Sequence, residues 1–131
     1  MQVAIDSRAH WVDTGVLIVA GATYELRATG TWRDASIDAD ASGYASANIF
    51  QRLTERLRRM PDARWFALIG AIDRREDTQF VIGTASRFRA TASGQLTCFA
   101  NDLRGFYFNN SGNVILTVEQ ELDPVASGKS E

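Results

Sequence analysis

Oxygen-bearing side chains are concentrated in one segment, Asn101–Gly112, which reads N-D-L-R-G-F-Y-F-N-N-S-G. It carries one carboxylate, three side-chain amides and a serine hydroxyl within twelve residues. Apolar, strand-like runs flank it, Leu96–Ala100 and Val114–Val118. A hairpin turn needs only an Asn-Gly or Asp-Gly pair, whereas Ca²⁺ binds about six to eight oxygens from carboxylates, amides and backbone carbonyls. The composition of this loop therefore indicates a cation site.

The loop offers few charges to such a cation. Asp102 is its only carboxylate, and Asn109 and Asn110 contribute neutral carbonyl oxygens. The short arc Gly105–Tyr107 can turn a backbone carbonyl, that of Phe106, toward the same point. A weakly charged site keeps open coordination positions, which water or the vicinal hydroxyls of a sugar would fill. The alternative is a polar hairpin loop whose Asn side chains hydrogen-bond to their own backbone.

Length and composition indicate one globular domain over residues 1–122, followed by a polar segment, 123–131, that is expected to be a flexible tail. Lys and Arg total 14 against 16 Asp and Glu, so no basic excess points to nucleic acid. The N-terminal residues do not resemble a secretory leader, and no apolar run suggests a membrane partner. We therefore expect a cytoplasmic protein, with non-classical export as the alternative.

The single cysteine, Cys98, excludes an internal disulfide and a cysteine-based zinc site. It lies in an apolar run, Leu96–Ala100, so we expect a buried strand residue.

Alternation of apolar and polar residues predicts strands along most of the chain. In Thr23–Thr29 every second side chain is apolar, which is typical of a half-buried strand. Trp65–Ile72 is almost continuously apolar and is expected to be a central strand. Further strands are predicted near Val3, with continuation through His10–Asp13, and at Gly15–Val19, Phe80–Gly83, Arg87–Ala90, Leu96–Ala100 and Val114–Glu121. These elements favour an all-β fold, an antiparallel β-sandwich.

Helical spacing interrupts the strands at residues 46–60, where we expect one inserted amphipathic helix. Its apolar stripe consists of Ile49, Phe50, Leu53, Leu57 and Met60. Asn48 and Gln51 are spaced for a capping box, and Pro61 ends the segment. Its arginines, Arg52, Arg56, Arg58 and Arg59, are expected to form a solvated face rather than a surface for a membrane or an acidic partner.

The loop resembles the calcium-site motif of the bacterial PA-IL-type galactose-binding lectins, N-D-x-x-G-x-Y-x-N-N-S-G. The matching residues are Asn101, Asp102, Gly105, Tyr107, Asn109, Asn110, Ser111 and Gly112. Looser similarity, in the same order, covers Gly30–Trp32, Ala67–Ile72 and Phe80–Gly83. The resemblance implies a jelly-roll β-sandwich and a galactose-like or other glycan as partner, with a homo-oligomer possible.

The resemblance also implies a ligand set. Ca²⁺ would be bound by the side chains of Asp102, Asn109 and Asn110, by the Phe106 carbonyl, and by a second carbonyl from Asp34 or Ala35. Sugar hydroxyls would complete the shell and hydrogen-bond to Asp102, Asn109 and the N–H of Leu103.

Two departures from the family pattern concern the sugar. The family uses a His and a Gln from a loop in the middle of the chain, whereas this chain has a predicted helix there and only one histidine, His10, far away in sequence. Gln51 lies nearest the expected position. Phe106 and Phe108 also replace smaller residues and could cover the open face of the site. The cation site therefore carries over, and the sugar specificity does not.

Other chemistry finds less support. Asp34, Asp38 and Asp40 could suggest the paired carboxylates of a glycosidase, but we expect solvated acids in a polar loop. No nucleophile with its base is recognisable, so we expect no enzyme. The leading interpretation is a calcium-dependent carbohydrate-binding domain. The alternative is a non-catalytic structural or protein-interaction β-sandwich module.

Overall fold

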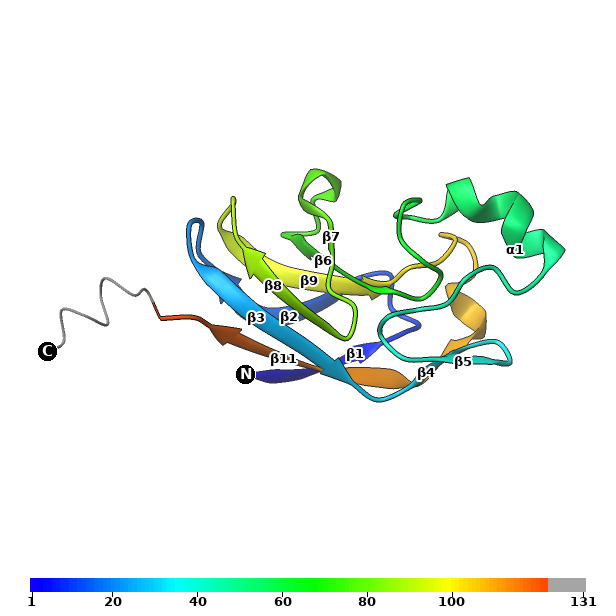
Figure 1. Cartoon of the computed structure of the whole chain (residues 1–131), viewed down its shortest axis with the longest axis horizontal. Helices are drawn as coiled ribbons and strands as arrows, with labels where there is room; N and C mark the ends of the chain where they lie inside the picture. Colours follow the sequence, from blue (N-terminus) through cyan, green and yellow to red (C-terminus); the bar gives the residue numbers. More distant parts are fainter. Residues whose placement is uncertain (123–131) are drawn as a thin grey trace, which may run out of the picture.

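The computed structural model describes residues 1–122 and consists mainly of antiparallel strands (Figure 1). One four-stranded sheet has the order β1 (Gln2–Asp6), β11 (Asn113–Gln120), β3 (Thr23–Thr29) and β8 (Ala85–Arg89). The second has the order β2 (Val12–Ile18), β9 (Gly94–Ala100), β6 (Leu68–Ile72) and β7 (Phe80–Val81). A third, small sheet has the order β10 (Asn110–Ser111), β4 (Trp32–Asp34) and β5 (Ile37–Ala39).

Helical segments are short: α1 (Ile49–Thr54) and the 3₁₀ turns η1 (Glu55–Leu57), η2 (Glu76–Thr78) and η3 (Tyr107–Asn109). No helix within residues 1–122 is long and apolar enough to cross a membrane. The all-β sandwich with one helix is confirmed. The predicted tail, 123–131, lies outside the described residues.

The main core lies between the two larger sheets. One cluster of buried side chains combines Leu26 and Leu116 from one sheet with Leu68, Leu96 and Cys98 from the other. The predicted strand Thr23–Thr29 is confirmed residue for residue, and its apolar side chains are the buried ones. Cys98 is fully buried in β9, as expected.

The central strand β6 begins later than its apolar run suggested. All five of its residues are buried, because a second cluster that includes Ile69 and Phe99 covers its other face. Before β6, Phe66 adopts a positive φ of 60°, and its N–H donates to the carbonyl of Asn101 at 2.7 Å. Trp65 forms only an isolated bridge with Tyr44. The prediction of a strand starting at Trp65 is therefore wrong by three residues.

The chain also turns before His10, so the predicted continuation of the first strand through His10 is wrong. β1 ends at Asp6, whose Oδ1 accepts a hydrogen bond from the backbone N–H of Arg8 at 2.9 Å. This is the short-range side-chain bond with which Asp commonly stabilises a turn. A new strand, β2, starts at Val12.

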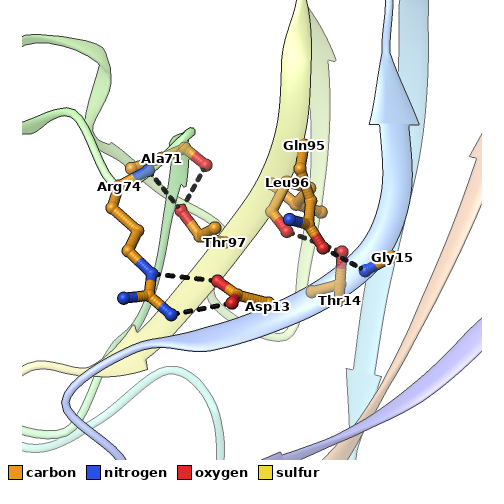
Figure 2. Close-up of polar contacts among 8 residues, drawn as sticks. All are labelled: Asp13, Thr14, Gly15, Ala71, Arg74, Gln95, Leu96 and Thr97. Atoms are coloured by element: carbon orange, nitrogen blue, oxygen red, sulfur yellow. Dashed lines mark hydrogen bonds and ion pairs between the residues drawn. The ribbon is translucent and has the colours of Figure 1, made fainter.

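An irregularity in β2 is held by one polar side chain of β2 and one of its neighbour β9 (Figure 2). The register shifts between Asp13 and Leu17. There the hydroxyl of Thr14 donates to the carbonyl of Leu96 at 2.6 Å, and Gln95 accepts from the N–H of Gly15 at 2.7 Å. Gly15 has a positive φ of 77°, which glycine adopts without strain. The bulge therefore leaves these backbone groups paired.

The same sheet is tied to the β6–η2 turn by a second polar contact (Figure 2). Arg74 forms two hydrogen bonds with the carboxylate of Asp13, at 2.7 and 3.0 Å. Thr97 links β9 to this turn and to β6. Its hydroxyl accepts a hydrogen bond from the N–H of Arg74 and donates one to the carbonyl of Ala71.

The helical segment differs most from the prediction. Only six residues form α1, and the expected inward-facing apolar stripe faces solvent instead: Ile49 is 67%, Leu53 78% and Leu57 67% exposed. The buried residue of α1 is Gln51. Asn48 caps the helix as predicted, accepting from the N–H of Gln51 at 2.9 Å. The position of this short helix is therefore set by the buried Gln51 rather than by the apolar stripe.

The arginines that follow α1 do not all form the expected solvated face. Arg59 is only 8% exposed, and its guanidinium lies 3.5 Å from the centroid of the Phe99 ring. It also donates to the hydroxyl of Tyr107 at 3.0 Å. Arginine stacks readily on aromatic faces because its charge is weakly hydrated. Arg59 therefore attaches the segment to the sandwich.

Leu53 provides a test of this orientation. We expect Leu53→Ser to change the free energy of unfolding by no more than about 0.5 kcal/mol, because the side chain is already in water. Urea unfolding measures the change. A loss of about 2 kcal/mol or more would show instead that the stripe is packed.

Candidate functional site

The oxygen-rich loop is joined to the β4–β5 hairpin by strand pairing. Asn110 pairs with Asp34, and Ser111 with Arg33. Beyond the pair, the N–H of Ala35 donates to the carbonyl of Asn109 at 3.1 Å. Figure 1 shows β4, β5 and α1 at the same end of the sandwich. Two segments far apart in sequence are thus fixed side by side.

Gly112 allows this close approach. Its φ is +82°, and a Cβ at this position would lie 3.3 Å from the Cα of Trp32. A larger residue would be strained by the backbone conformation and would press on the β4 backbone. Glycine at this motif position therefore has a structural reason.

A cavity of about 210 Å³ lies between the loop, the hairpin and the start of α1. Nearly all of the site residues predicted from the sequence line it: Asp34, Ala35, Gln51, Asp102, Leu103, Phe106 and Asn109. Asn110 is buried beside them, 3% exposed, and its amide Nδ2 donates to the carbonyl of Ser7 at 2.9 Å. The structure thus brings the predicted residues together at one place.

Three buried oxygens of the loop have no hydrogen-bond partner within the described residues: Asp102 Oδ2, Asn109 Oδ1 and Asn110 Oδ1. Buried polar atoms are nearly always paired, since an unpaired one costs about 1–3 kcal/mol. These three are also the side-chain oxygens that the sequence proposed as cation ligands. The donor set fits a hard cation that takes carboxylate and amide oxygens.

Asp34 lines the same cavity, and its carboxylate is not the solvated group that we expected. It is 8% exposed, and Tyr44 donates a hydrogen bond from its hydroxyl to Asp34 Oδ2. Gln51 Nε2 in turn donates to the Tyr44 hydroxyl at 2.6 Å. The sequence holds only one sign of this burial, the alternation in β4 with Trp32 inward, Arg33 outward and Asp34 inward, and three residues are too few to assign a face from it.

The other two acids of that region are solvated, as predicted. Asp38 forms an exposed ion pair with Arg33 at 3.4 Å, and Asp40 caps the backbone of Ser42. The three carboxylates therefore do not form a glycosidase-like pair.

Both cavity carboxylates resist ionisation. Burial raises the pKa of Asp102 to about 7, the charge of Asp34 adds to the rise, and the N–H of Leu103 and the nearby amide of Asn110 oppose it. Burial also raises the pKa of Asp34, against the hydrogen bond from Tyr44. No Lys, Arg or His within residues 1–122 forms a salt bridge with either group. A bound cation would supply the missing positive charge.

These pKa shifts predict an unusual dependence of stability on pH when no cation is present. The native protein binds more protons than the unfolded chain between pH 4 and 7, because the pKa of Asp102 rises from 3.8 to about 7 on folding. Its contribution to the free energy of unfolding therefore falls as pH rises through this window, by up to about 4 kcal/mol. Urea unfolding in chelator should show this fall. Asp102→Asn should flatten it, and an unchanged profile in that variant would contradict the assignment.

No cluster of three or more His, Cys, Asp or Glu residues suited to a metal occurs within the described residues. A cation here would depend on amide and backbone oxygens as well as carboxylates. Such ligands suit Ca²⁺ rather than the nitrogen- and sulfur-preferring Zn²⁺.

Two motif residues serve the fold. Asn101 is fully buried and binds the backbone of the preceding loop: it accepts from Met60 N–H at 2.9 Å and donates to carbonyls of Met60, Ala63 and Arg64. Tyr107 is 3% exposed, and its hydroxyl donates to the carbonyl of Ala100. The loop therefore contains structural residues, Asn101 and Tyr107, as well as residues that face the cavity.

The two phenylalanines of the loop lie differently. Phe106 is 39% exposed and lines the cavity. Phe108 is 70% exposed and does not line it. Only Phe106 can therefore narrow the cavity. His10 contacts the ring of Tyr107, at 4.5 Å between centroids, and does not line the cavity either.

Comparison with known proteins supports the fold. No protein-family model matches the sequence, and no curated protein does. A solved structure described as "EclA N-terminal domain; PllA-like lectin" superposes with a TM-score of 0.70, covering 92% of this chain and 95% of that chain. The chain has a lectin-type β-sandwich fold. Sequence identity to that lectin is 21%, so the likeness concerns the fold, and the PA-IL-type resemblance stays a prediction.

Proposed function

We propose that this lectin-type sandwich is a non-catalytic, calcium-dependent carbohydrate-binding domain. The observation that carries the proposal is the set of buried, unpaired oxygens on Asp102, Asn109 and Asn110 beside a cavity. These side chains would bind Ca²⁺ together with the carbonyl of Phe106 and that of Asp34 or Ala35. A bound Ca²⁺ would attract the hydroxyl oxygens of a sugar.

The cavity suits a small ligand. Its volume of about 210 Å³ is below the roughly 300–1,000 Å³ of pockets for drug-sized molecules, which favours one sugar ring. Asp102 and Asn109 would accept hydrogen bonds from sugar hydroxyls. The N–H of Leu103 is engaged by Asp102 Oδ1 at 2.7 Å, so it becomes available to a sugar only if that contact is released.

Gln51 supports this cavity rather than providing a free amide. Its Oε1 accepts from the N–H of Ala47 at 2.7 Å, and its Nε2 donates to Tyr44. We therefore assign Gln51 to holding the wall, with one N–H left for a ligand.

The proposal is tested by adding and removing calcium. We expect Ca²⁺ at about 100 times its Kd to stabilise the native protein by about 2.7 kcal/mol, and EDTA to reverse this. A glycan array probed in calcium and in EDTA then identifies sugars whose binding is lost with the cation. No rise in Tm with calcium, or equal glycan binding in EDTA, would overturn the proposal.

A second function is favoured by one observation, the exposed apolar side chains of α1 and η1, which are Ile49, Phe50, Leu53 and Leu57. Clustered exposed apolar side chains commonly mark interaction sites. If calcium raises Tm while no glycan binds, the chain is instead a structural or protein-interaction module that has kept the ion.

A further inference from the structure

We propose that the carboxylate of Asp34 is a second anionic ligand of the cavity's cation, and that Tyr44 and Gln51 position it. This inference rests on the proposed function. The family resemblance implies only a backbone carbonyl from this segment, whereas the structure points to the Asp34 side chain.

The strand pairing places Asp34 beside the loop ligands. Asp34 is the residue of β4 that pairs with Asn110, and β4 turns its side chain inward. It lines the same cavity as Asp102 and Asn109. The cavity therefore receives one carboxylate from β4 and one from the oxygen-rich loop, beside amide oxygens of the loop that have no hydrogen-bond partner within residues 1–122.

A relay of hydrogen bonds fixes the Asp34 carboxylate. Tyr44 donates to its Oδ2, and Gln51, in the first turn of α1, donates to the Tyr44 hydroxyl. The other carboxylate oxygen, Oδ1, makes no hydrogen bond within residues 1–122 and is available to a cation. Such outer contacts orient a ligand, and their loss commonly weakens metal binding about 10–100-fold.

Two carboxylates alter what the site binds. When both are ionised, as a bound cation favours, Asp34 and Asp102 together carry two negative charges, which match one divalent cation. The affinity of oxygen sites for Ca²⁺ rises with the number of charged ligands. The site should therefore hold a divalent cation, or Tb³⁺ as a hard trivalent probe, before any sugar arrives.

The test compares Asp34→Asn with a matched control, Asp38→Asn, on the same hairpin. Asp38 is exposed and paired with Arg33. Calcium affinity is measured by calorimetry, and Tb³⁺ by its luminescence sensitised through Trp65, which lines the cavity. We expect Asp34→Asn to raise the Kd for Ca²⁺ at least about 10-fold, Tyr44→Phe to raise it in the same direction, and Asp38→Asn to leave it unchanged.

Folding of the variants is checked by Tm in EDTA. We expect Asp34→Asn to melt at the same or a higher temperature than the native chain, since it keeps an oxygen for the Tyr44 hydroxyl and removes a buried charge that forms no salt bridge within residues 1–122. Unchanged calcium affinity in Asp34→Asn would overturn the inference, and unchanged affinity in Tyr44→Phe would overturn the positioning role. Absence of calcium binding in the native chain would instead overturn the proposed function itself.

Discussion

Replacing Asp102 by asparagine is expected to abolish calcium binding, with a loss of affinity of at least about 100-fold. Asp102 is 3% exposed, and its Oδ2 is one of the buried oxygens that lack a partner. Asparagine keeps the shape and an oxygen for the N–H of Leu103 but removes the charge. Removing one partner of a buried charge interaction typically costs about 3–5 kcal/mol, so the cation should not be held at millimolar calcium.

Calorimetric titration of Ca²⁺ measures this loss, and Asp38→Asn again provides the control. A second readout has the opposite sign. In EDTA at pH 7.5, Asp102→Asn should be at least as stable as the native chain, because burial already raises the pKa of Asp102 to about 7. A variant that binds calcium normally would show that the cation, if any, lies elsewhere.

The second large effect concerns Asn101, a structural residue of the loop. Asn101→Ala is expected to lower the free energy of unfolding by about 2–4 kcal/mol. The substitution removes the acceptor of Met60 N–H and the donor to three carbonyls, those of Met60, Ala63 and Arg64. Because Asn101 is fully buried, these groups would lose their partner without gaining water.

Urea or thermal unfolding measures the change in stability. Asn113→Ala is the matched control, since Asn113 is exposed and lies at the start of β11. The Asn101→Ala variant should still bind calcium as long as it is folded. In the native chain the side-chain oxygen of Asn101 accepts from the N–H of Met60, so it is not a cation ligand. Loss of calcium affinity without loss of stability would make Asn101 a ligand instead of an anchor.

Strands with one buried face were predictable from sequence. Alternation in Thr23–Thr29 defined both the limits and the inward face of β3, because successive side chains of a strand point to opposite faces of the sheet. The cavity-facing residues were also predictable in kind. A hairpin turn does not require so many carboxylate and amide oxygens in one loop, and the structure places them around one cavity.

What the sequence did not reveal depends on contacts between distant segments. Helical periodicity shows which residues of a helix share a face, not what that face meets. In α1 the apolar face meets water and Gln51 faces inward, because the Gln51–Tyr44–Asp34 contacts define how the helix docks. Arg59 likewise resembles a surface residue in the sequence, because the Phe99 ring on which its guanidinium stacks is distant along the chain.

The burial of the Asp34 side chain is another feature that depends on contacts between distant segments. A short strand such as β4, with three residues, gives too little alternation to assign a face with assurance. Phe66 is similar, because a positive φ in a non-glycine residue is imposed by its surroundings, here the crossing with the Tyr44 segment.

The brevity of β10 has a consequence for motion. Only two residue pairs join β10 to β4, so the walls of the cavity can part without disturbing the two large sheets. Such a unit opens locally at a free energy well below that of global unfolding. Amide hydrogens of the β4–β5 hairpin should therefore exchange with deuterium sooner than those of β6 or β9, and a ligand bridging the two walls should slow that exchange selectively.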